Sequence, residues 1–131
     1  MEEMTLEQYR RLLRQGDTKN LTRAFEAQWK RIGGPPLRKE VKFHPTRRFR
    51  FDYAADPLRL KIAIELEGGT WLPDGGGHNR GGHYTKDCIK YNEAARLGWR
   101  VFRFTTDMLR DDPVGHLAPV RDFIREELHR G

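Results

Sequence analysis

Hydrophobic and polar residues alternate in two short stretches in the middle of the chain. In residues 48–55, aromatic side chains occupy every second position from Phe49 to Tyr53, and in residues 62–67 aliphatic side chains do the same. Alternation with a period of two is typical of β-strands, and Asp56-Pro57 between the two stretches has the composition of a turn. The pattern therefore predicts a β-hairpin over residues 48–67.

The same alternation fixes the register of the hairpin. Pairing Tyr53 with Ile64 sets apolar residues opposite one another, whereas a slip of one residue would move every apolar side chain to the wrong face. This register places Asp52 directly opposite Glu65, with Glu67 on the same face. Like charges directly opposed across a sheet are destabilising, so we expect a cation between Asp52 and Glu65.

Mg²⁺ is the expected cation, with Mn²⁺ as its substitute. A hard divalent ion takes oxygen ligands, usually one or two protein carboxylates completed by water and substrate phosphate. The alternative is a solvated strand face on which Arg48, Arg50 and Lys61 neutralise the acids.

Apolar residues recur at helical spacing on both sides of the hairpin. They predict helices over residues 5–16, 20–32 and 84–97 and a further helix after Pro113, and Thr5 and Gln8 have the spacing of a capping box. Residues 41–43 and 99–104 are predicted strands, and the helix before the last strand implies a parallel crossover. The expected structure is a single α/β domain over residues 1–131, a mixed central sheet flanked by helices, with residues 1–18 and 113–131 as peripheral helices.

A glycine-dense loop follows the hairpin and is longer than a compact domain normally tolerates unless the loop has a function. It carries His78, Arg80 and His83 among glycines that let the backbone approach a ligand closely. In the helix that follows, Lys86 and Lys90 are four residues apart and share a face. We expect these cationic side chains to contact substrate.

The charge balance favours a polyanionic partner. The chain has 25 Lys and Arg against 19 Asp and Glu, a net charge of +6 and a pI near 9.8. Cys88 is the single cysteine, which excludes an intrachain disulfide and predicts a reducing, intracellular setting. No stretch is apolar enough for a membrane span, and the acidic start does not suit a signal peptide, so we expect a cytoplasmic protein of cellular or viral origin.

The order of acidic residues along these elements resembles the PD-(D/E)XK nuclease superfamily. Glu26 lies on a helix, Asp52 on the second strand, and Glu65 two residues before a third site residue on the next strand, followed by a crossover helix and strand. The resemblance covers residues 26–104 and implies the restriction-endonuclease-like αβββαβ core. One position departs from the family pattern, because Glu67 stands where the family usually has lysine.

The resemblance also implies a role for each site residue. Asp52 and Glu65 would hold the divalent metal with the carbonyl of Leu66, and Glu26 would orient the attacking water. Lys90 is the first candidate for the displaced motif lysine and Lys86 the second. The remaining cationic residues would position DNA through its phosphates: Arg48, Arg50, His78, Arg80, His83 and Lys86.

Within the superfamily, the small size and basic charge are most similar to the archaeal and phage Holliday-junction resolvases. That similarity implies a homodimer that nicks four-way DNA junctions during recombination and repair, leaving 5′-phosphate and 3′-hydroxyl ends. A mismatch-nicking or restriction-like endonuclease is the enzymatic alternative, and a DNA-binding protein with a decayed nuclease site is the non-catalytic one. Two weaker alternatives are an HNH-type site on His78-Asn79 and His83, and a zinc site from His78, His83 and Cys88.

Overall fold

A computed structural model describes residues 5–14, 18–68 and 80–130 of the chain. Its helices are α1 Leu6–Arg14, α2 Thr18–Arg31, α3 Arg80–Arg96, α4 Thr106–Asp111 and α5 Pro113–Arg130. Its strands are β1 Arg38–Lys42, β2 Arg50–Ala55, β3 Ile62–Glu67 and β4 Arg100–Thr105.

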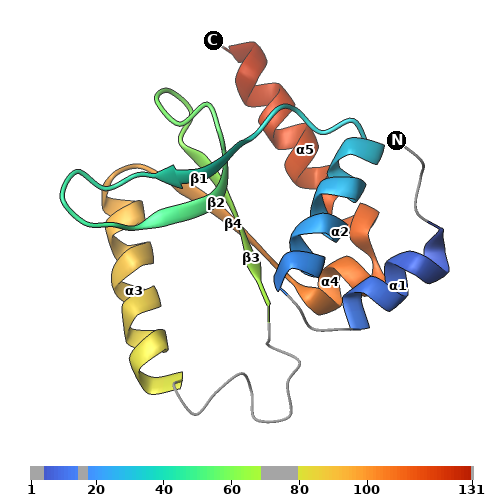
Figure 1. The fold of residues 1–131 in the computed structure, drawn as a ribbon. Helices are drawn as coiled ribbons and strands as arrows, with labels where there is room; N and C mark the ends of the chain where they lie inside the picture. Colours follow the sequence, from blue (N-terminus) through green and yellow to red (C-terminus); the bar gives the residue numbers. More distant parts are fainter. Residues whose placement is uncertain (1–4, 15–17, 69–79, 131) are drawn as a thin grey trace.

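The four strands form one mixed sheet in the order β1-β2-β3-β4. β2 runs antiparallel to both β1 and β3, and β4 runs parallel to β3 after the α3 crossover. Helix α3 lies on one side of the sheet, and α1, α2, α4 and α5 lie together on the other (Figure 1). The predicted α/β class, with a mixed sheet flanked by helices, is confirmed.

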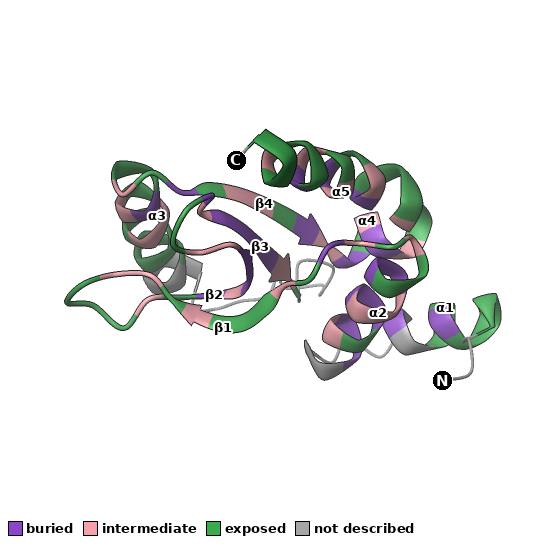
Figure 2. Ribbon diagram, turned by 90° about the horizontal axis from the view of Figure 1, so that it is seen from above, coloured by how far each residue is buried: buried purple, intermediate pink, exposed green. Residues whose placement is uncertain are grey.

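Each face of the sheet has its own hydrophobic cluster. The larger cluster joins the apolar faces of α1, α2, α4 and α5 to the sheet around Phe25, Ile62 and Ile64, all of which are fully buried. The smaller cluster joins α3 to the opposite face through Ala94 and Phe51. Figure 2 shows that burial is concentrated in the central strands and in the helix faces turned toward them.

Several local predictions are confirmed. Tyr53 pairs with Ile64 in the expected register. Thr5 and Gln8 exchange the two hydrogen bonds of a capping box, at 2.9 and 3.1 Å. Gly98 has φ +88° after α3, the left-handed conformation of a helix C-cap.

The prediction that Phe51 and Tyr53 share one face of the hairpin is wrong. Phe51 packs in the α3 cluster, with its ring 4.1 Å from that of Phe43, whereas Tyr53 packs in the opposite cluster against Phe25 at 4.8 Å. The strand alternation breaks at Asp52, between these two aromatic residues. A strand that bends locally no longer follows the period of two on which the prediction relied.

Helix boundaries also differ from the prediction. α3 begins at Arg80 rather than at residue 84, so Arg80 and His83 belong to its first turn and not to the preceding loop. Gly81-Gly82 lowers helix propensity, but propensity is a weak guide that context overrides. The short helix α4 was not predicted. Leu6 and Leu128 have the helical spacing of the apolar residues that predicted the first and last helices, but they are 63% and 40% exposed.

Helix α5 contributes Leu117, Val120 and Ile124 to the larger cluster. No helix among the described residues has the length and apolar composition needed to cross a membrane.

Candidate active site on the α3 face of the sheet

The site begins where β2 and β3 separate. Their ladder is regular from Ala55 and Ile62 as far as the Tyr53–Ile64 pair. At the next position, the backbone N–H of Asp52 donates to the side chain of Glu65 (Oε1, 2.8 Å), and the backbone N–H of Leu66 donates to Asp52 (Oδ2, 2.8 Å). Hydrogen bonds to the two carboxylates therefore replace the backbone hydrogen bonds of the ladder. The carboxylates are held at the fork, the point where β2 and β3 separate.

Helix α3 presents two donors to Glu65. The ammonium group of Lys90 lies 2.7 Å from Oε2 of Glu65, and the hydroxyl of Tyr91 donates to the same oxygen at 2.9 Å. The side chains of Lys90 and Glu65 are only 17% and 9% exposed. A desolvated ion pair with further hydrogen bonds has a well-defined geometry, so Lys90 is positioned by the fold rather than free in solvent.

Glu67 lies next to this group. Its Oε1 accepts from the guanidinium of Arg103 at 2.7 Å and lies 3.3 Å from the hydroxyl of Tyr91. The guanidinium also lies 4.3 Å from the centre of the Tyr91 ring. The parallel pairing of Glu65 with Arg103 in β4 brings this cation to the site.

Burial raises the pKa of both central carboxyl groups. For Asp52 the main cause is desolvation, opposed by the hydrogen bond from Leu66 and by the charge of Lys90. For Glu65 desolvation again raises the pKa, and the hydrogen bond and charge of Lys90 oppose it. Carboxylates that are costly to keep charged are typical of functional sites that bind a cation.

Glu40 is a fourth acid near the fork. It lies on β1 between the two residues that pair with Tyr53 and Phe51, opposite Asp52, and its charge raises the pKa of Asp52. Its φ of +52° is in the left-handed region, which is uncommon for a residue with a side chain. The side chain of Glu40 is exposed.

The donor set suits a hard divalent cation, because Asp52, Glu65 and Glu67 offer carboxylate oxygens within one region. The carbonyl of Leu66, the further ligand expected, lies in β3 between Glu65 and Glu67. As the described side chains stand, no three acidic, histidine or cysteine groups converge to enclose an ion. The cations Lys90 and Arg103 are bonded to the carboxylates instead.

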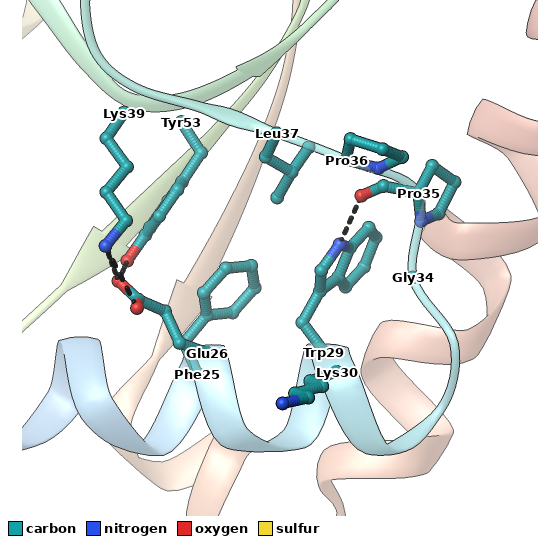
Figure 3. A pocket seen from close by; sticks show the side chains of 10 residues that line it. All are labelled: Phe25, Glu26, Trp29, Lys30, Gly34, Pro35, Pro36, Leu37, Lys39 and Tyr53. Carbon is teal, nitrogen blue, oxygen red and sulfur yellow. Dashed lines mark hydrogen bonds and ion pairs between the residues drawn. The ribbon is translucent and has the colours of Figure 1, made fainter. Parts of the chain in front are cut away.

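Glu26 lies in a different place. It borders a cavity of about 240 Å³ between α2 and β2, where it accepts from the hydroxyl of Tyr53 at 2.6 Å and pairs with Lys39 at 3.1 Å (Figure 3). The rings of Phe25 and Trp29 also line this cavity. Among the described residues, no direct bond connects Glu26 to Asp52 or Glu65, and its role in orienting water stays a prediction.

The residues expected to bind DNA are described only in part. Arg48 and Arg50 are exposed around the start of β2, and Lys86 is exposed on α3 one turn before Lys90. His78 lies outside the described residues, as do the side chains of Arg80 and His83. Of the residues named for the HNH and zinc alternatives, the structure describes the side chain of Cys88, which is exposed on α3.

Sequence reasoning missed Glu40, Tyr91 and Arg103. Tyr91 could have been found, because it follows Lys90 on the helix expected to face the sheet. Arg103 required the register of β4 against β3, and Glu40 required the pairing of β1 with β2, and neither leaves a signal in a single sequence.

Comparison of the chain with known protein families, with curated proteins and with solved structures found no match.

Proposed function

We propose that this chain is a divalent-metal-dependent endonuclease that hydrolyses phosphodiester bonds in DNA, with four-way junctions as its substrate. One observation carries the proposal: Asp52 and Glu65 meet where β2 and β3 separate, with the partly buried Lys90 beside them. Two acids and a cation in this arrangement provide what phosphodiester hydrolysis needs, namely ligands for a metal and a positive charge for the transition state.

The topology supports the finer assignment to the restriction-endonuclease-like fold. From α2 to β4 the elements follow the order α-β-β-β-α-β, with three antiparallel strands and the fourth parallel to the third. The acidic residues occupy the second and third strands of this series, as in the nuclease superfamily that the sequence resembles.

The side chains have distinct roles in the proposed reaction. Asp52 and Glu65 would hold the cation, and Glu67 lies beside them, bonded to Arg103. When bound, a divalent cation lowers the pKa of water and offsets charge on the attacked phosphate. Water attacks the phosphorus in line with the 3′ oxygen and releases a proton to solvent. The bond from phosphorus to the 3′ oxygen breaks, and this oxygen takes up a proton from solvent, so one product carries a 3′ hydroxyl and the other a 5′ phosphate. Lys90 offsets the charge that grows on the phosphate oxygens.

The basic exposed side chains support DNA as the substrate class. Arg48 and Arg50 extend from the β1–β2 connection and the start of β2, and the chain carries a net charge of +6. Arginine forms bidentate contacts with phosphate, which position DNA without reading its sequence. Two symmetric nicks in a junction require two sites, so the proposal includes a two-fold homodimer.

The test is nicking of a synthetic four-way junction beside a linear duplex of the same sequence. Each DNA is incubated with Mg²⁺ or with EDTA, using the wild-type chain and Asp52→Asn. We expect paired, symmetric, Mg²⁺-dependent nicks in the junction alone, and none with Asp52→Asn. Equal cutting of duplex would assign the site to a restriction or mismatch-repair enzyme. Tight binding of DNA with no cutting at all would contradict the enzymatic proposal.

The dimer is tested separately by sedimentation of the wild-type chain at the concentrations used for nicking. We expect a mass of two chains. A strict monomer would contradict the resolvase assignment while leaving a metal-dependent nuclease in place.

A further inference from the structure

We propose that Lys90 is a built-in competitor of the divalent cation. Its ammonium group holds the cation position beside Glu65 until metal displaces it, and displacement frees Lys90 to reach the phosphate of the substrate. This inference rests on the proposed function and adds an order of events, in which metal binding precedes the contact between Lys90 and DNA.

Three described hydrogen bonds occupy three of the roughly four acceptor positions of the Glu65 carboxylate, including both of those on Oε2. Oε1 accepts from the backbone of Asp52 at 2.8 Å, which is fixed by the strand. Oε2 accepts from Lys90 at 2.7 Å and from Tyr91 at 2.9 Å. A metal ion that binds Oε2 must therefore replace one of these two donors, and the ammonium group is the one whose positive charge the metal supplies in its place.

Glu67, the other carboxylate that is paired with a cation, is not an alternative binding position for the metal. Glu67 is bonded to Arg103, whose guanidinium also lies over the ring of Tyr91. The Arg103 side chain is 48% exposed, so this cation is already solvated at the edge of the site, whereas the ammonium of Lys90 is largely enclosed. Among the groups described, Lys90 is thus the cation whose release opens the fork to metal.

Burial makes the exchange of one cation for another the favoured route. The ammonium of Lys90 is enclosed between the rings of Phe51, at 5.4 Å, and Tyr91, at 5.5 Å. Removing one partner of a buried ion pair leaves an uncompensated charge, which is strongly destabilising. Lys90 therefore leaves Glu65 when a metal ion binds and compensates the negative charge of Glu65. The freed ammonium group then pairs with a nearby anionic phosphate.

The first test measures Mn²⁺ binding by calorimetry, without DNA, for wild type, Lys90→Met and Lys86→Met. Methionine keeps the length and the apolar stem of lysine but removes its charge, and Lys86 is an exposed control on the same helix. All three proteins are measured in the same slightly alkaline buffer. We expect Lys90→Met to bind Mn²⁺ about tenfold more tightly, because a charged hydrogen bond no longer has to be broken. We expect Lys86→Met to bind as wild type does.

Unchanged or weaker Mn²⁺ binding by a folded Lys90→Met would overturn the inference. Wild-type chain that binds no Mn²⁺ would instead contradict the proposed function itself. The two failures are therefore distinguishable in one set of measurements.

The second test uses the wild-type chain alone and does not depend on the variant folding. Acetic anhydride modifies exposed lysines faster than buried, ion-paired ones, and mass spectrometry reports the rate at Lys90 relative to Lys86. We expect Mn²⁺ to raise the relative rate at Lys90 severalfold, because the ammonium has left Glu65. A rate at Lys90 that does not change at saturating Mn²⁺ would overturn the inference.

Discussion

The backbone N–H of Asp52 donates to the carboxylate of Glu65 at 2.8 Å at the point where the β2–β3 ladder stops. The carboxylate of Glu65 on β3 is therefore held in place by the backbone of Asp52 on β2. These hydrogen bonds keep both carboxylates in position without a metal. Such preorganisation has a cost, because the carboxylates are partly desolvated and their pKa values are raised.

We expect Asp52→Asn to abolish cleavage, to keep DNA binding, and to stabilise the metal-free fold. The raised pKa means that the ionised form of Asp52 is disfavoured in the folded chain, and asparagine can still accept the bond from Leu66. Allowing for solvent screening at this half-buried group, the gain is roughly 0.5 kcal/mol, or about 2 °C in Tm. The gain in stability over wild type should disappear as the pH is lowered, because wild-type Asp52 then takes up a proton.

Asp122→Asn, which makes the same charge change on the surface, is the control. An Asp52→Asn variant that cleaves normally would show that the site is wrongly placed.

Tyr91→Phe should weaken the site without removing it. The substitution deletes the hydroxyl that donates to Glu65 but keeps the ring beneath Arg103. Groups that orient metal ligands typically change affinity or activity by about 10- to 100-fold, and we expect about a tenfold rise in the Mg²⁺ concentration for half-maximal nicking. Tyr84→Phe, at an exposed tyrosine on the same helix, should have no effect. Equal Mg²⁺ dependence in the two variants would remove Tyr91 from the site.

Gly34→Ala should destabilise the fold by about 1–3 kcal/mol, measured by urea unfolding. A Cβ atom at this position would overlap the indole of Trp29, whose N–H is fixed by a 2.8 Å bond to the carbonyl of Pro35. If that overlap is the cause, the loss should be smaller when Trp29 is already replaced by Leu, because the two positions are in contact. Additive losses in the double variant would point to another cause.

Lowering the pH should remove the stabilising contribution that the ionised Glu93 carboxylate makes to the folded state. Hydrogen bonds from Arg96 and then from His44 lower the pKa of this carboxyl group from 4.5 to about 2. A lowered pKa means that the contribution is complete above the ordinary pKa and is lost as the pH falls through about 2. The difference in unfolding free energy between wild type and Glu93→Gln should therefore shrink from neutral pH to about pH 2. A difference independent of pH would show that the two bonds do not depend on the charge of Glu93.

The sequence is informative where local pattern and chemistry coincide. Alternating apolar residues are enough to predict the Tyr53–Ile64 register, and that register by itself places Asp52 beside Glu65. The spacing on the crossover helix puts Lys86 and Lys90 on one face, and Lys90 is the one that is hydrogen-bonded to Glu65.

The remainder depends on three-dimensional relationships that leave no local pattern. The break in alternation at Asp52 puts Phe51 and Tyr53 on opposite faces. The pairing of β4 with β3 brings Arg103 to Glu67. α4 does have a recognisable start, since Thr105 caps it through the N–H of Met108, but the helix is too short to show a period.

The separation of the two hydrophobic clusters affects how this protein can change over generations. The carboxylates and Lys90 lie on the α3 side, whereas most of the large, fully buried side chains lie on the other. Substitutions that adjust the chemistry on the α3 side therefore leave intact the larger cluster, which contributes most of the folding free energy. Lineages of such a chain can gain, retune or lose activity and still inherit a stable fold.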